Sequence, residues 1–136
     1  MLSNRTAFLI IAAALAATPL TAQEADPDAA LQVTRAVLAT DVVDREPVGE
    51  AESFAAGVGQ VYFYTVFEGD FPETRVEHVW LREGEEMARV ALTVRGPRWR
   101  TWSSKAIPAD WAGDWEVQVV DGAGNVLESA SFTVGS

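Results

Sequence analysis

The chain has 136 residues, with 10 basic against 20 acidic side chains and a formal net charge of −10 at pH 7. A surface of that sign repels nucleic-acid phosphates and anionic lipids, so we expect neither as a partner. The chain has no cysteine, which excludes disulfides, a lipidated cysteine and thiolate metal sites.

The first 22 residues have the pattern of a secretory signal peptide. Arg5 gives a positive start, an apolar run covers 7–17, and Pro19 and small residues follow. As a helix this run is about 17 Å long, well short of the ~30 Å hydrocarbon core of a membrane. We predict cleavage after Ala22, with cleavage at 17 or 25, or an uncleaved anchor, as the alternatives.

A signal peptide predicts an exported protein without stable membrane insertion after cleavage. The lack of cysteine fits a bacterial periplasm better than an extracellular fluid, although the latter is the alternative location. Residues 23–30 are acidic and interrupted by proline, which is typical of a flexible leader. Residues 31–136 have the length of a single domain.

Seven stretches of that domain have the composition of β-strands, rich in β-branched and aromatic residues. Short glycine-containing connections at 83–86 and 121–125 predict hairpins. Gly49–Ala56 is the one stretch compatible with a helix, and Pro108–Ala112 with a single turn. The seven predicted strands are Leu31–Ala39, Val61–Phe67, Thr74–Arg82, Met87–Arg95, Arg98–Ile107, Asp114–Val120 and Val126–Val134.

Apolar and polar residues alternate in the last two predicted strands. Trp115, Val117 and Val119 share one face of the first. In the second strand the apolar face comprises Val126, Ala130, Phe132 and Val134. One apolar face per strand predicts an all-β fold in which two antiparallel sheets pack together as a sandwich.

Several motifs stand out between residues 33 and 134. They are Val43-Asp-Arg-Glu-Pro47, His78-x-Trp80, Gly96-Pro-Arg-Trp-Arg-Thr-Trp-Ser-Ser-Lys105, Gly113-x-Trp-x-Val-x-Val-x-Asp121, Gly124 and Phe132. In these motifs the chain resembles a bacterial family of domains of unknown function, number 2914. The resemblance implies an exported, immunoglobulin-like domain and supplies no activity, cofactor or catalytic residue.

The predicted strand 98–107 is basic in an otherwise acidic protein. Strand alternation places Arg98, Arg100, Trp102 and Ser104 on one face, opposite to Trp99. One tryptophan must then face the core and the other the outside, and the sequence leaves open which. An outer tryptophan among arginines is a candidate site for an anion or a sugar. The alternative is a tryptophan covered by arginine stems.

His78 and Trp80 form a second candidate binding pair, because they share a strand face. We expect His78 to be structural and hydrogen-bonded near the sheet surface. It is the only histidine of the chain, so a zinc site with three or four ligands is not expected. The turn 121–125 lacks the spacing of a calcium loop.

No catalytic set is evident, and we expect neither an enzyme nor a cofactor. There is no Gly-x-Ser-x-Gly motif, and His78 has no evident serine partner. Ser104 and Lys105 are neighbours in a strand and would point apart. The segment 44–47 predicts a salt-bridged turn rather than an acid–base pair, since Pro47 favours extended geometry at Glu46.

Two hypotheses about function remain. The first is a non-catalytic accessory module of the bacterial cell envelope that binds another envelope protein through strand edges or loops. The second is a binder of a small anionic or glycan ligand at the face of Arg98, Arg100 and Trp102.

Overall fold

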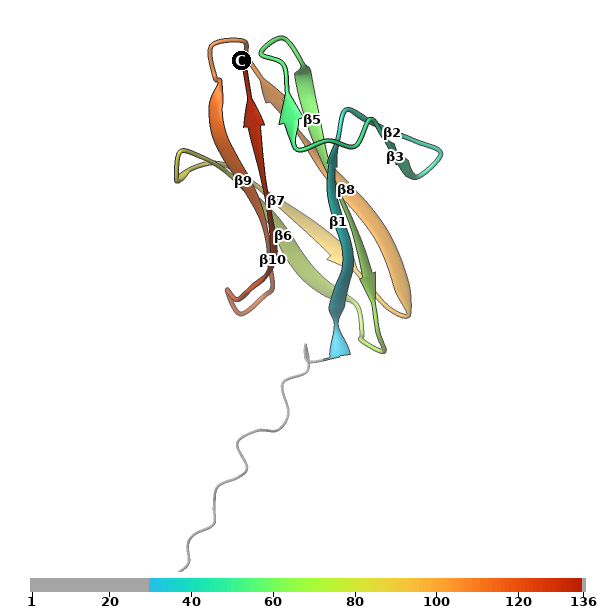
Figure 1. The fold of residues 1–136 in the computed structure, drawn as a ribbon. Coiled ribbons are helices and arrows are strands. Elements are labelled where there is room, and N and C mark those ends of the chain that lie inside the picture. The colour runs from blue at the N-terminus through green and yellow to red at the C-terminus, as the bar shows by residue number, and fades with distance from the viewer. Residues whose placement is uncertain (1–29, 136) are drawn as a thin grey trace, which may run out of the picture.

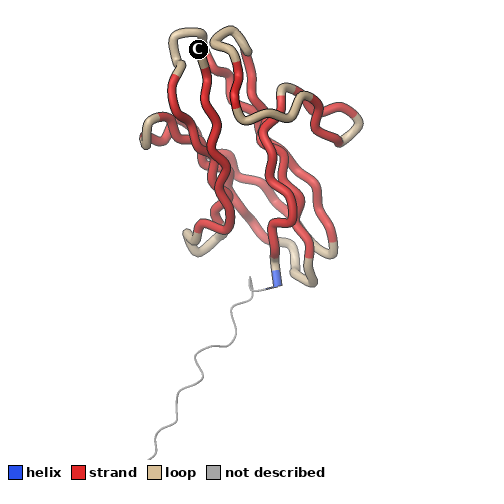
Figure 2. The backbone as a smooth tube through the Cα atoms, in the orientation of Figure 1, coloured by secondary structure: helices blue, strands red, loops and turns tan. Residues whose placement is uncertain are grey.

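A computed structural model describes residues 30–135 of the chain. The predicted signal peptide at 1–22 and nearly all of the predicted leader at 23–30 lie outside these residues. The described part is built of ten β-strands joined by short turns (Figures 1 and 2). They are β1 (Gln32–Ala39), β2 (Asp41–Val43), β3 (Glu46–Val48), β4 (Ser53–Phe54), β5 (Gly59–Glu68), β6 (Thr74–Arg82), β7 (Glu85–Val94), β8 (Arg98–Ile107), β9 (Gly113–Val120) and β10 (Val126–Val134).

The strands form a sandwich of two sheets, which confirms the predicted all-β class. One sheet has the order β1-β5-β8, and the other has the order β4-β10-β9-β6-β7 (Figure 1). The neighbouring strands β5 and β8 correspond to strands B and E of an immunoglobulin sandwich. In the other sheet, the order β6-β9-β10 corresponds to C-F-G. All sheet pairs are antiparallel except β4 with β10, which is parallel.

The seven predicted strands correspond to the seven long strands, within one or two residues at their ends. Three short strands were not predicted. β2 and β3 form a separate hairpin, and β4 lies within Gly49–Ala56, so the stretch that was compatible with a helix does not form one. The predicted turn after Ile107 is present, since the backbone N–H of Trp111 donates to the carbonyl of Pro108 at 2.9 Å.

The core lies between the two sheets and is formed by the inward faces of the strands. Trp115, Val117 and Val119 are buried as predicted. Val126 was placed on the buried face of β10, and this is wrong because its side chain is 53% exposed. A β-bulge between Val126 and Glu128 shifts the alternation by one residue, so Leu127 packs against the core instead.

The β6–β7 connection is tighter than predicted. Glu83 and Gly84 have φ values of 50° and 83°. Positive φ at both central residues is the requirement of a two-residue type I′ hairpin turn, and glycine meets it without steric cost. Within residues 30–135, no helix has the length and hydropathy needed to cross a membrane.

Candidate functional site

The six predicted site residues separate into two groups, one on the outer face of the smaller sheet and one in the interior of the sandwich. The register of β8 against β5 is uninterrupted from Arg98 to Ile107, so strand alternation holds throughout. Trp99 packs against the core, and Trp102 lies on the outer face. This answers the question that the sequence left open, and it places Arg98, Arg100 and Ser104 outside with Trp102.

His78 and Trp80 lie in the interior, both with no exposed surface. Their strand, β6, is a central strand of the larger sheet, between β7 and β9. The prediction that His78 lies near the sheet surface is therefore wrong. The local sequence is ambiguous because Val79, on the other face of β6, is also buried. Ligands in solvent do not reach His78 or Trp80.

A chain of hydrogen bonds joins the two sheets through His78. Its Nδ1 lies 2.7 Å from Ser103 Oγ, and its Nε2 lies 3.2 Å from Thr65 Oγ1. The indole N–H of Trp80 donates to the same Ser103 Oγ at 3.2 Å, and the Thr65 hydroxyl donates to the carbonyl of Thr101 at 3.1 Å. Both hydroxyls come from the smaller sheet, and His78 and Trp80 come from the larger one.

For a neutral imidazole, the two ends of this chain fix the direction of every bond in it. An indole N–H only donates, so Ser103 accepts from Trp80 and its own proton is free for His78 Nδ1. A carbonyl only accepts, so Thr65 donates to it and accepts from His78 Nε2. The neutral imidazole then has its proton on Nε2, and all four side chains are satisfied.

Burial opposes the charged form of this histidine. Desolvation lowers the pKa of His78 to about 3 from the usual 6.5. At neutral pH the interior therefore carries a neutral, fully hydrogen-bonded histidine.

No local pattern signals the contact between Ser103 and His78, so the serine partner that was not evident in the sequence appears only in the fold. The two residues are 25 positions apart and meet only because β8 and β6 face each other across the core. A serine beside a histidine is a nucleophile–base pair in many enzymes. Here Ser103 is only 7% exposed, and the second imidazole nitrogen meets a threonine rather than a carboxylate.

The outer face of β8 is covered in part by the β2–β3 hairpin. Arg100 Nη1 lies 2.6 Å from Glu46 Oε2 and donates to the carbonyl of Arg45 at 3.3 Å. The hydroxyl of Tyr64, on β5, donates to the same carbonyl at 2.7 Å. Glu46 also approaches Arg35 at 3.7 Å. The predicted salt-bridged turn at 44–47 is confirmed, and its partners come from all three strands of the sheet.

The remaining outer-face residues are also engaged. The Trp102 ring stacks on Tyr64 with ring centroids 5.9 Å apart and an interplanar angle of 14°. Arg98 Nε lies 3.6 Å from Glu68 Oε2, so each outer arginine of β8 has a carboxylate neighbour. Lys105, on the opposite face of β8, lies 5.0 Å from the ring centroid of Trp111. The two outer arginines of β8 thus already have carboxylate partners within the domain.

Metal binding finds little support in the side chains of residues 30–135. They contain no group of three or more histidine, cysteine, aspartate or glutamate residues that could hold a metal ion. Asp121 instead closes its own turn, accepting from the backbone N–H of Ala123 at 2.9 Å and of Asn125 at 2.8 Å. Burial alone would raise the pKa of Asp121, but these hydrogen bonds outweigh it and hold the pKa below the usual value.

The family comparison covers some of the residues that form these contacts. The model of a family described as "Protein of unknown function (DUF2914)" matches residues 73–134. Over these 62 residues the chain is similar to the DUF2914 family. The match includes His78, Trp80 and the whole of β8, and it confirms the family resemblance there. Val43–Pro47 precedes the matched part.

Solved structures with some likeness to this chain are large enzymes. A β-glucosidase from Kluyveromyces marxianus is 10% identical, with a TM-score of 0.45 over 79% of this chain and 14% of the enzyme. A β-glucosidase from Listeria innocua is 8% identical, with a TM-score of 0.44 over 78% of this chain and 16% of the enzyme. No curated protein matches the sequence.

Proposed function

We propose that this domain is a non-catalytic accessory module of the bacterial cell envelope that binds another protein. The observation that carries the proposal is the burial of His78 and Ser103. The one histidine–serine contact of the described residues is sealed between the sheets, where it meets no substrate. The surface instead offers strand edges and loops, the elements through which sandwiches bind protein partners.

The proposed location rests on the sequence of residues 1–22. Their positive start, short apolar run and small-residue exit support export, to the periplasm or alternatively to the extracellular space. The net charge of −10 argues against nucleic acid as a partner. After signal cleavage we expect no stable membrane insertion.

Crosslinking in envelope extract tests the proposal. The mature protein, carrying a photo-crosslinking group at an exposed position, should capture one or a few defined proteins. A Trp115→Ala variant, with its core disrupted, should lose this capture. Failure to capture any defined protein, at several label positions, would count against the proposal.

A binder of a small anion or glycan is the alternative, and the geometry supports it less well. Trp102 is partly exposed, which favours stacking of a sugar. However, Arg98 and Arg100 already have carboxylate neighbours, which a ligand would have to displace. Titration with acidic sugars should change tryptophan fluorescence if this alternative holds, and Trp102→Ala should abolish the change.

A further inference from the structure

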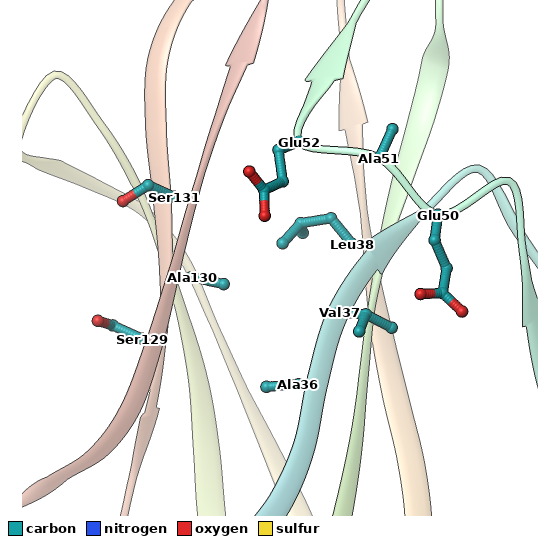
Figure 3. Close-up of a pocket in the computed structure, with 9 residues that line it drawn as sticks. All are labelled: Ala36, Val37, Leu38, Glu50, Ala51, Glu52, Ser129, Ala130 and Ser131. Carbon is teal, nitrogen blue, oxygen red and sulfur yellow. The ribbon is translucent and has the colours of Figure 1, made fainter.

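A hollow lies where the edge of one sheet approaches the edge of the other. It has a volume of about 570 Å³ and runs between β1 and β10, with residues 50–52 at one end. Figure 3 shows Ala36 and Ala130 pointing into it from the two strands, with Leu38 beside them. Because both alanines are small, the space between the strand edges is not filled by side chains.

The β10 edge on this hollow has backbone groups without a strand partner. β4 pairs only with Thr133 and Val134, at the end of β10. The N–H of Thr133 donates to the carbonyl of Glu52 across this edge. Because backbone groups alternate sides along a strand, Ser131 and Ser129 also direct theirs towards the hollow. Residues 126–132 therefore continue the edge beyond the point where β4 ends.

In the free domain, local hydrogen bonds satisfy some backbone groups of these edges. The N–H of Ser129 donates to the side chain of Glu128 at 3.1 Å, in place of a strand partner. On the opposite wall, the carbonyl of Leu38 accepts from the N–H of Ala51. By the same alternation, Ala36 directs its backbone groups into the hollow. Both walls thus offer unpaired strand edge to an extended segment.

The negative charge at the hollow favours a basic segment over an acidic one. The carboxylate of Glu52 points into it (Figure 3) and makes no ion pair within residues 30–135. Glu50, in contrast, points away and is held by Arg35 at 2.5 Å. A lysine or arginine of the incoming segment would supply the charge that Glu52 lacks.

We propose that this hollow takes an extended basic segment of the partner protein, which adds to β10 as a strand in line with β4. The segment would pair its backbone with Ser129 and Ser131, place an apolar side chain over Ala36 and Ala130, and place a basic one at Glu52. This inference rests on the proposed function, since it names the surface and the partner chemistry of the same binding module.

A capped peptide of alternating valine and lysine is the probe, titrated into the mature protein and followed by NMR. We expect the amide signals of Ser129, Ser131 and Ala36 to shift and amide exchange at Ser131 to slow. A peptide with glutamate in place of lysine should bind at least about tenfold more weakly, as one mismatched charge contact predicts. N-methylation of alternate peptide residues should abolish binding, since it removes one row of backbone donors.

Variants of the domain locate the site. Glu52→Lys should weaken binding of the lysine peptide about tenfold or more. Glu85→Lys makes the same charge change on β7, away from the hollow, and should leave binding unchanged. Ser131→Pro removes the edge N–H and should abolish binding, while Ser131→Ala keeps it and should not. If Ser131→Pro does not fold, the N-methylated peptide tests the same hydrogen bonds.

Several results would overturn the inference. They are no binding of the lysine peptide, equal binding of the glutamate peptide, and shifts confined to β7 or β8. Concentration-dependent shifts at Ser131 in the protein alone would assign the hollow to a second copy of the chain instead. If the Glu52→Lys and Ser131→Pro variants crosslink the envelope partner as well as wild type does while the peptide fails, the binding module stands and only this surface is wrong.

Discussion

The hydroxyl of Ser103 is hydrogen-bonded to two buried side chains, so we expect a substitution at this position to lower the stability of the fold. It accepts from Trp80 and donates to His78. Ser103→Ala would leave an indole N–H and an imidazole nitrogen without partners, and each buried group left unsatisfied costs about 1–3 kcal/mol. We expect a loss of about 2–4 kcal/mol in the free energy of unfolding by urea.

Ser104→Ala is the matched control for that change. Its side chain lies on the exposed face of the same strand, and exposed substitutions usually change stability by less than about 0.5 kcal/mol. Equal effects of the two substitutions would contradict the hydrogen-bond chain described for the interior.

The low pKa of His78 predicts a pH dependence of stability. Burial lowers the pKa to about 3 in the folded state, against 6.5 for the free side chain. The unfolded chain therefore binds the proton first, so the contribution is complete above pH 6.5 and is lost as the pH falls towards 3. Between pH 7 and pH 5 the loss is about 2 kcal/mol, from 1.36 kcal/mol per pKa unit.

Urea unfolding at the two pH values, for wild type and His78→Gln, measures this contribution. The variant has no titrating group at this position, so its stability should change less between pH 7 and pH 5, whatever its absolute value. NMR of the imidazole should show no titration in the folded protein above about pH 4. A midpoint near 6.5 would mean that the ring is accessible to solvent.

Residue faces were predictable where the alternation is regular and misjudged where it is interrupted. The opposite orientation of Trp99 and Trp102 follows from strand geometry alone, and the unbroken register of β8 preserves it. The bulge in β10 reverses the assignment of Val126, and nothing in its sequence marks the extra residue. The burial of His78 was not predicted. A polar side chain on a central strand can be buried when residues distant in the sequence supply its hydrogen bonds, and Thr65 and Ser103 do so here.

At the level of elements, the β2–β3 hairpin closes over the outer face through a few specific bonds. Each of its strands has three residues, and neither strand is long enough to show an alternating pattern. Its turn has φ of 52° at Asp44 and 65° at Arg45, which residues other than glycine rarely adopt. Contacts with Tyr64 and Arg100 hold Arg45 and Glu46 in place.

Tyr64→Phe removes one of these bonds and nothing else. The loss of a hydrogen bond from the phenol to the Arg45 carbonyl should cost about 1 kcal/mol of stability. The hairpin should also open more often, so trypsin should cleave after Arg45 several times faster than in wild type. Tyr62→Phe, two residues earlier in β5, is the control and should leave this cleavage rate unchanged.

For the whole molecule, the absence of cysteine leaves the core as the main source of stability. Trp115 is 2% exposed and stacks on Phe132 at 5.8 Å between ring centroids. Trp115→Ala should cost about 3–5 kcal/mol, out of the ~5–15 kcal/mol that is usual for a domain. Chemical denaturation measures it, and a loss below about 1 kcal/mol would show that Trp115 is not part of the core.

The sandwich itself was predictable because its long strands carry regular patterns and clear turns. The candidate sites were predictable only as separate motifs. The pairing of 44–47 with Arg100 depends on a chain reversal after β1, and the contact of His78 with Ser103 depends on how two sheets align. Both are long-range consequences of the fold, and a local pattern in the sequence does not encode them.

The placement of β1 and β10 has a mechanical consequence. Figure 1 shows β1 beginning at one end of the sandwich and β10 finishing at the other. Tension applied between these two points runs along the strands, at right angles to the hydrogen bonds of the antiparallel ladders. All the bonds that join β1 to β5 and β10 to β9 would then bear the load together in shear, so the domain would resist stretching as one block rather than opening pair by pair.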